Sequence, residues 1–327
     1  MAILVTGGAG YIGSHTVKFL RSQNEEVVVL DNLSKGHKEA VGDAHFYEGD
    51  IRDKDLIAEI CRKHDIEGVV HFAAYSLVGE SMKEPFAYYT NNVAGTLELL
   101  KALVANKVKN LVFSSTAAVY GEPDRIPIEE TDKTIPTNPY GETKLAIEKM
   151  LKWSFKAYGL NSICLRYFNA AGADPEGQLG EDHHPETHLI PLILSVALGQ
   201  RDTITVYGDD YDTSDGTCVR DYIHVLDLAS AHYQALKKLQ TTKGALAYNL
   251  GNGAGFSVME VIKTARLITG KDIPVVKGSR RLGDPAVLVA SPKKAEAELK
   301  WQRQFSSLEN IVKDAWQWHK SHPQGYR

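Results

Sequence analysis

The chain has 327 residues, of which 43% are hydrophobic and 24% charged, and its formal net charge is −4. These values are ordinary for a folded protein, and the length suggests about two domains. They exclude a largely disordered chain, a collagen-like chain and a small disulfide scaffold. The mild negative charge argues against a nucleic-acid partner, because nucleic-acid binders usually carry a strong basic patch.

Cysteine usage and hydropathy predict a cytoplasmic protein. Cys61, Cys164 and Cys218 are far apart and form no C-x-x-C pair, which fits a reducing compartment. No stretch reaches the roughly 18 apolar residues of a membrane span, and the N-terminus lacks the features of a signal peptide. We therefore expect no membrane association.

The first half of the chain alternates short apolar segments with longer amphipathic ones. The apolar segments lack in-and-out alternation, which is typical of parallel strands covered on both faces. We expect such strands at residues 3–5, 27–30, 69–72, 111–113 and 163–165, and helices at 11–22 and 91–106. This order predicts an α/β fold with a Rossmann-type, doubly wound parallel sheet.

The pattern changes near Ala170. Residues 170–188 are predicted to form a long loop, followed by helices at 189–199 and 258–269 and short strands at 203–206 and 273–276. We therefore predict an NAD-binding domain over residues 1–168 and a smaller mixed α/β domain, binding the substrate, over residues 169–327. A strand near 246–251 is expected to return to the first sheet.

A glycine-rich turn follows the first expected strand and opens the first expected helix. Gly8-Ala9-Gly10-Tyr11-Ile12-Gly13 satisfies G-x-G-x-x-G, and Gly7, Gly10 and Gly13 give the related G-x-x-G-x-x-G spacing. Glycines allow the backbone to approach a pyrophosphate closely, and the helix N-terminus offers free N–H groups to it. A glycine turn without a ligand is the alternative that the motif alone leaves open.

An acidic residue ends the second expected strand. Asp31 follows Gly13 at about the 20-residue distance of a dinucleotide-binding site, where a carboxylate accepts hydrogen bonds from the adenosine ribose and repels a 2′-phosphate. This position favours NAD over NADP as the cofactor, although a turn residue is the alternative role. Asp50, in Gly49-Asp50-Ile51, is predicted either to accept from the adenine amino group or to serve as an ordinary turn residue.

The segment from Asn138 to Lys144 predicts the start of another helix, with Asn138 as N-cap and Pro139 as the first helical residue. Tyr140 and Lys144 then lie on one face as i and i+4. A nearby ammonium and a cationic nicotinamide would lower the pKa of Tyr140, which could then exchange a hydroxyl proton during hydride transfer. A surface Tyr/Lys pair is the alternative.

These motifs, together with Ser114-Ser115-Thr116 after the strand at 111–113, resemble the extended short-chain dehydrogenase/reductase family over nearly the whole chain. The resemblance is closest to its UDP-galactose 4-epimerase branch, and the stretches typical of nucleotide-sugar members carry it: Leu165-Arg166-Tyr167-Phe168-Asn169, Val219-Arg220-Asp221-Tyr222-Ile223-His224-Val225, Tyr248-Asn249-Leu250-Gly251 and Arg280-Arg281-Leu282-Gly283-Asp284. It implies reversible NAD-dependent 4-epimerisation of UDP-galactose and UDP-glucose. It also implies a homodimer that pairs helices near 92–106 and 140–157.

The resemblance further implies which residues do this work. Tyr140, Lys144 and Thr116 would be catalytic. Contacts to NAD would come from Gly7, Gly10, Tyr11, Ile12, Gly13, Asp31, Asn32, Asp50, Ile51, Phe72, Ala73, Ala74, Asn92, Tyr140, Lys144 and Tyr167. The UDP-sugar would be contacted by Thr116, Tyr140, Asn169, His188, Leu189, Tyr207, Arg220, Arg281, Asp284 and Leu288. Guanidinium groups bind phosphate bidentately, which fits Arg220 and Arg281 to the diphosphate.

Several positions depart from the family pattern or bear on the alternatives. Ala117 and Ala118 stand where dehydratase relatives carry an acid pair, which favours epimerisation over dehydration. Ser76 replaces a lysine that reaches the cofactor in many relatives, and His188 replaces an asparagine of the uridine pocket. Leu288 replaces a bulky tyrosine, and we therefore hypothesise some activity on UDP-N-acetylglucosamine. An oxidoreductase or dehydratase of the same family and a non-catalytic NAD-sensing module remain alternatives.

Acidic and histidine side chains gather in the segment Asp182-His183-His184-Pro185-Glu186-Thr187-His188. Their spacing matches no standard zinc pattern. We therefore predict a solvated loop and no metal at this segment.

Overall fold

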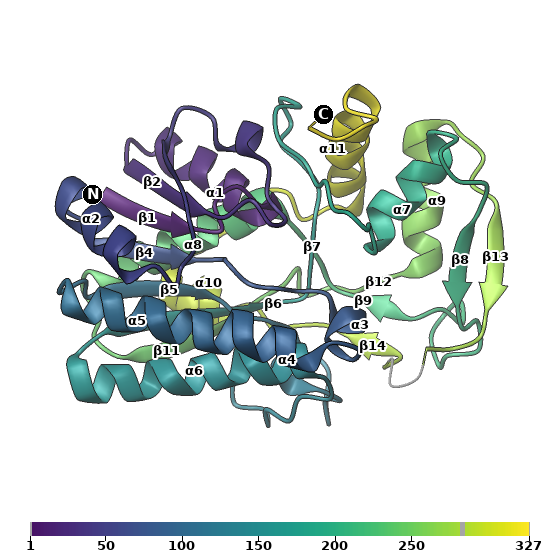
Figure 1. Cartoon of the computed structure of the whole chain (residues 1–327). Helices are drawn as coiled ribbons and strands as arrows, with labels where there is room; N and C mark the ends of the chain where they lie inside the picture. The colour runs from purple at the N-terminus through teal and green to yellow at the C-terminus, as the bar shows by residue number, and fades with distance from the viewer. Residues whose placement is uncertain (1, 282–284, 327) are drawn as a thin grey trace.

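The structure is a computed structural model that describes residues 2–281 and 285–326. Its centre is a seven-stranded sheet in the order β11-β6-β5-β4-β1-β2-β3 (Figure 1), and all neighbouring strands run parallel. The strands are β1 (Ala2–Thr6), β2 (Glu26–Asp31), β3 (His45–Glu48), β4 (Gly68–His71), β5 (Asn110–Ser114), β6 (Asn161–Tyr167) and β11 (Ala245–Leu250). The predicted Rossmann-type, doubly wound α/β fold is confirmed.

Two sets of helices cover this sheet, one on each face (Figure 1). Against one face pack α1 (Tyr11–Ser22), α8 (Val225–Leu239) and α10 (Lys293–Leu299). Against the other pack α2 (Lys54–His64), α5 (Gly95–Ala105) and α6 (Pro139–Tyr158). Because both faces are covered, every residue of β1 is buried, which explains why the strand sequences are continuously apolar.

The predicted elements of the first half are present, with one difference at residues 89–106. A π-helical turn, η2 (Tyr89–Ala94), precedes α5 there. Asn92 lies in this turn, and its buried side-chain amide contacts the backbone of Tyr75 and the hydroxyl of Thr143. Short helical segments complete this half: η1 (Lys38–Val41), α3 (Val78–Ser81), α4 (Pro85–Tyr88) and η3 (Ala117–Tyr120).

A second group of elements lies beyond the carboxyl ends of the central strands (Figure 1). Helices α7 (Leu189–Ala197), α9 (Val258–Thr269) and α11 (Leu308–Ser321) share a hydrophobic core there. The accompanying strands form three smaller sheets: β7 (Asn169–Ala171) with β10 (Tyr222–His224), β8 (Ile204–Tyr207) with β13 (Val275–Gly278), and β9 (Val219–Arg220) between β12 (Phe256–Ser257) and β14 (Val287–Leu288).

The second half of the chain contributes to both groups of elements. Helices α8 and α10 pack on the central sheet, and β11 pairs with β6 at its edge. The division of the chain at residue 168 therefore stays a prediction. Among the described residues, no helix combines the length and the apolar character needed to span a bilayer.

A buried ion pair joins α6 to β6 behind the end of β5. Arg166 donates to both carboxylate oxygens of Glu148, from Nε at 2.9 Å and from Nη2 at 2.5 Å. Ser115 also donates to Glu148 at 2.6 Å, and Nη1 of Arg166 donates to the hydroxyl of Tyr120 at 2.8 Å. These bonds fix the chain on either side of Thr116, which lies between Ser115 and the helical turn containing Tyr120.

Replacing Arg166 by methionine should lower the free energy of unfolding by about 3–5 kcal/mol, because Glu148 would remain as a buried charge without its partner. Chemical denaturation followed by fluorescence measures this loss. The double variant Glu148→Leu with Arg166→Met removes both charges and should recover most of it. A single Arg166→Met variant as stable as the unmodified protein would contradict the assignment of this pair.

Candidate active site

The glycine turn lies between β1 and α1, and two of its glycines are required by contacts within the protein. Gly7 has φ +75°, and a Cβ there would lie 2.5 Å from the backbone nitrogen of Ala73. A Cβ on Gly13 would lie 2.1 Å from the carbonyl oxygen of Gly7. Gly10 differs, because its nearest neighbour would be 3.5 Å away, which is an ordinary contact. A ligand lying against the backbone would explain glycine at this third position.

The start of α1 faces this turn and is suited to an anion. Gly10 is the N-cap residue, and among the described residues no side chain caps the helix there. Its first N–H groups therefore remain available to an anion such as a pyrophosphate. Tyr11, the first helical residue, donates its hydroxyl to the carbonyl of Gly172 at 2.7 Å. The turn thus also contacts the chain that leaves β7.

Asp31 supports the glycine turn from the end of β2. Its carboxylate accepts from the backbone N–H groups of Ala9 at 3.0 Å and of Leu33 at 2.9 Å. Burial raises the pKa of Asp31, and these two bonds oppose the rise in part. Each carboxylate oxygen can accept a further bond. The residue therefore has the chemistry that ribose hydroxyls require.

Asp50 is held by a neighbouring cation. Arg52 donates from Nε and Nη2 to its two oxygens at 2.7 and 2.6 Å, and Asn32 donates to it at 3.2 Å. The hydrogen bonds from Arg52 lower the pKa of Asp50 to about 2. An adenine amino group would have to share this carboxylate with both partners. The neighbouring Ile51 is buried.

The other residues predicted to contact NAD lie at neighbouring strand ends. Phe72 and Ala73 follow β4, and their N–H groups donate to the carbonyl of Thr6 at 2.9 and 3.1 Å, which places the segment with Ala74 beside the glycine turn. The amide of Asn92 is engaged by Tyr75 and Thr143, as described above. Asn92 thereby positions the loop that follows β4.

Tyr140 and Lys144 lie at the start of α6, next to the end of β5. Asn138 accepts a hydrogen bond from the N–H of Gly141 at 2.9 Å, so the predicted N-cap is confirmed. Lys144 is only 2% exposed, and its Nζ donates to the carbonyl of Ser114 at 2.8 Å. The same Nζ lies 5.8 Å from the centre of the Tyr140 ring. Lys144 therefore faces the interior and Tyr140 is half-buried, so the pair does not lie on an open surface.

Burial controls the proton affinity of both groups. It raises the pKa of Tyr140 to about 12, against a smaller lowering by a hydrogen bond with Thr116. Burial also lowers the pKa of Lys144 to about 7. The protein's own groups thus do not produce the lowered tyrosine pKa that we predicted, because desolvation of a phenolate outweighs the help it receives. A bound cation next to Tyr140, such as an oxidised nicotinamide, would supply the additional positive charge.

Ser114 is a site residue that the sequence marked only as part of a strand-ending motif. Its carbonyl holds Lys144, and its hydroxyl forms a 2.5 Å hydrogen bond with the hydroxyl of Tyr167. Thr116, two residues later, accepts a hydrogen bond from the N–H of Ala118 at 3.1 Å. A polar residue at the end of an apolar parallel strand was the available signal, since such ends line the ligand-binding edge of the sheet.

The predicted substrate residues lie in the second group of elements. Leu288 of β14 packs against a small cluster that includes Ala117 and Val119, which directly follow Thr116. The guanidinium of Arg281 lies 4.1 Å from the centre of the Tyr207 ring, a cation–π contact that the sequence did not predict.

The remaining predicted substrate residues occupy the ends of short elements. Asn169 opens β7, and Arg220 closes β9 and donates to the carbonyl of Val219 at 2.7 Å. His188 is the N-cap of α7, and Leu189 is its first residue. Asp284 lies outside the described residues.

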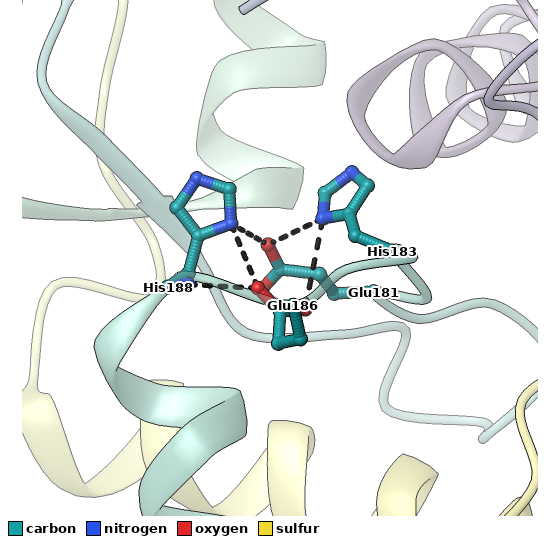
Figure 2. A group of neighbouring side chains, drawn as sticks. All are labelled: Glu181, His183, Glu186 and His188. Carbon is teal, nitrogen blue, oxygen red and sulfur yellow. Dashed lines mark hydrogen bonds and ion pairs between the residues drawn. The ribbon is translucent and has the colours of Figure 1, made fainter. Parts of the chain in front are cut away.

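His188 also belongs to a cluster with Glu181, His183 and Glu186 (Figure 2). Glu181, just before the segment predicted as a solvated loop, is only 5% exposed, whereas His184 and His188 within that segment are exposed. The loop is covered from two sides, because the ring of Tyr11 lies 6.2 Å from that of His183 and the hydroxyl of Tyr326 contacts the backbone of Gly180. Burial lowers the pKa of His183, but the carboxylates outweigh it and raise the pKa to about 9.

Comparison with known proteins identifies the family. The chain matches the NAD dependent epimerase/dehydratase family over residues 3–251. The chain belongs to this family. Its cofactor is accordingly NAD, which fits the glycine turn and Asp31. A UDP-glucose 4-epimerase from Halalkalibacterium halodurans is 62% identical over 100% of this chain and 98% of its own length.

Solved structures of the family have the same fold. A crystal structure of a UDP-glucose 4-epimerase matches with a TM-score of 0.98 and 54% identity, over 100% of both chains. The UDP-glucose 4-epimerase from Bifidobacterium longum, solved in complex with NAD⁺ and UDP, matches with a TM-score of 0.94 and 39% identity, also over 100% of both chains. The resemblance to nucleotide-sugar epimerases is therefore confirmed along the whole chain.

Gly10→Ala should weaken NAD binding while leaving the stability of the fold almost unchanged. The new methyl group fits the protein, so the free energy of unfolding should fall by less than about 1 kcal/mol. It would stand against the pyrophosphate, so the affinity for NAD should fall by more than about tenfold. Calorimetric titration of nucleotide-free protein measures this affinity. Gly13→Ala is the contrasting variant, because its Cβ would clash with Gly7 and destabilise the fold itself. An unchanged NAD affinity in Gly10→Ala would place the cofactor elsewhere.

Proposed function

We propose that this family member interconverts UDP-galactose and UDP-glucose by reversible 4-epimerisation through a 4-keto sugar, and that NAD stays bound throughout. One observation carries the proposal. The half-buried Tyr140 and the buried Lys144, with Thr116 beside Tyr140, lie at the end of β5 in the same sheet whose β1 opens into the glycine turn. The highly similar relatives described above, which are UDP-glucose 4-epimerases, support it.

Tyr140 would exchange the proton of the sugar's 4-hydroxyl group. Bound NAD supplies the hydride acceptor and donor for carbon 4. Thr116 would orient the sugar oxygen, since its hydroxyl already bonds with Tyr140. Lys144 would take up or keep a proton as the phenolate forms, because each charge favours the other and the pKa of Lys144 is near neutrality. The carbonyl of Ser114 holds the amine in place for this role.

The nucleotide part of the substrate would provide most of the binding energy. Arg220 and Arg281 would bind the diphosphate, with Tyr207 stacking near the uracil. Asn169, the backbone of His188, Leu189 and Asp284 would complete this set. Weak contacts to the hexose would let the 4-keto sugar turn over, so that hydride returns to its opposite face.

Two other functions, dehydration and NAD sensing without catalysis, are less well supported by the residues present. Ala117 and Ala118 follow Thr116 directly and offer no acid or base for dehydration. A non-catalytic NAD-sensing module would not need a tyrosine–lysine pair of this kind.

Incubation with UDP-galactose and no added cofactor distinguishes an epimerase from an oxidoreductase. We expect UDP-glucose to form without free NADH, whereas release of NADH with an oxidised sugar would identify an oxidoreductase.

Tyr140→Phe should lower the turnover of UDP-galactose by about 10²–10⁴-fold, because the proton exchange is lost. Chromatography of the nucleotide sugars measures this loss, and release of NAD on denaturation shows that the cofactor is retained. Tyr248→Phe is the matched control, since the hydroxyl of this buried tyrosine in β11 donates to Glu298. Near-normal turnover in Tyr140→Phe would overturn the mechanism.

Leu288 is proposed to leave room for an N-acetyl group at carbon 2 of the sugar. Leu288→Tyr should therefore lower the turnover of UDP-N-acetylglucosamine by more than about tenfold, and that of UDP-galactose much less. Parallel assays of both sugars on both proteins measure the ratio. If the unmodified protein does not turn over UDP-N-acetylglucosamine at all, the hypothesis fails.

We further propose that the chain forms a homodimer through α5 and α6. These helices carry large exposed apolar side chains, among them Leu97 at 40% and Trp153 at 67% exposure. A cytoplasmic location also stays a prediction.

Trp153→Glu should shift the mass measured by light scattering from that of a dimer to that of a monomer, because a charge would be buried in the interface. Leu267→Glu, at a residue of α9 that is 85% exposed, is the control that should remain dimeric. A monomeric unmodified protein would contradict this arrangement.

A further inference from the structure

We propose that Glu181, His183, Glu186 and His188 bind one structural Zn²⁺ ion in the loop between β7 and α7. Each residue offers one ligand atom, and all four atoms lie within 4.8 Å of one another. Figure 2 shows that the four side chains converge on one point from different parts of the loop. This proposal is independent of the epimerase reaction.

The separations between the ligand atoms are close to those of tetrahedral coordination. Nδ1 of His183 lies 3.2 Å from Oε1 of Glu181 and 3.7 Å from Oε2 of Glu186. Nδ1 of His188 lies 2.8 Å from Oε1 of Glu181 and 3.2 Å from Oε1 of Glu186. Zinc bonds to nitrogen and oxygen of about 2.0–2.2 Å give a tetrahedron whose ligand atoms are about 3.4 Å apart. The separations lie on either side of this value, with Glu186 reaching His183 through Oε2 and His188 through Oε1.

A second observation also indicates a ligand at the centre. Glu181 is almost completely buried, yet its Oε1 makes no hydrogen bond of acceptable geometry to any described residue, and neither does the buried Nδ1 of His183. Buried polar atoms normally have such partners, and a bound ion is one of the established reasons when they do not. The two atoms lie 3.2 Å apart, which is within ion-pair distance.

The chemistry of the donors selects the ion and its role. Two imidazole nitrogens and two carboxylates form a mixed nitrogen and oxygen set of the kind that binds zinc. Four ligands from the protein close the coordination sphere, which is typical of a structural site rather than a catalytic one. The ion would fasten the loop before α7 next to Tyr11 at the start of α1.

The spacing of these four residues differs from the standard zinc patterns. Glu181, His183, Glu186 and His188 lie within eight consecutive residues of an irregular segment. Standard zinc patterns describe ligands on helices, hairpins or paired turns. An irregular loop can bring four side chains to one point without such a pattern, and only its three-dimensional course shows that it does.

The test uses the full-length protein, treated with a chelator and reloaded with ZnCl₂. Elemental analysis should find one Zn²⁺ per chain, and reloading should raise the melting temperature. Co²⁺ in place of Zn²⁺ should give the visible absorption of a tetrahedral site. Glu181→Gln and His183→Gln each remove a ligand and should weaken Zn²⁺ binding by at least about 100-fold.

His184→Gln is the matched control, because His184 lies in the same loop but contacts Asp182 instead of the cluster. It should keep the zinc content of the unmodified protein. His45→Gln checks the other histidine and glutamate group, formed by Glu26, His45 and His64. The proposal is overturned if the unmodified protein takes up no Zn²⁺, if Glu181→Gln and His183→Gln bind it as well as the unmodified protein, or if His45→Gln removes it.

Discussion

The hydrogen bond from Lys144 to the carbonyl of Ser114 is the contact on which the site depends. It places an amine in the protein interior at the end of β5, close to the tyrosine that would exchange the substrate proton. The same burial makes the charged forms of both side chains costly. A positively charged partner next to Tyr140 would therefore be needed to favour its phenolate.

This contact needs a rigid surrounding, which a second buried interaction provides. The ion pair of Glu148 with Arg166 connects α6 to β6, and Ser115 and Tyr120 extend it to both sides of Thr116. A buried ion pair contributes little net stability, but it fixes which groups face each other. Here it holds the end of β5 and the helix α6 in a fixed relative position. Proton exchange between hydroxyl groups requires such fixed geometry.

The loop between β7 and α7 connects the two groups of elements. Tyr11 of the nucleotide-binding helix reaches Gly172 at its beginning, and the buried Glu181 lies further along it. The cluster around Glu181 therefore lies between α7, which follows this loop, and Tyr11 at the start of α1. A bound metal ion would make this connection stiff, whereas ion pairs alone would leave it dependent on protonation.

Local patterns in the sequence by themselves determined the parallel sheet, the glycine turn with Asp31, the capped start of α6 and the pairing of Tyr140 with Lys144. These features depend on residues that are close along the chain, and their periodicity and spacing are set by backbone geometry. The resemblance to nucleotide-sugar enzymes extended this to residues of the second half. Only the tertiary structure decided how strongly Tyr140 and Lys144 are desolvated, that Arg281 stacks on Tyr207, and that Glu181 is buried among histidines. Those properties depend on segments far apart in sequence, because burial is produced by whatever the fold packs against a residue.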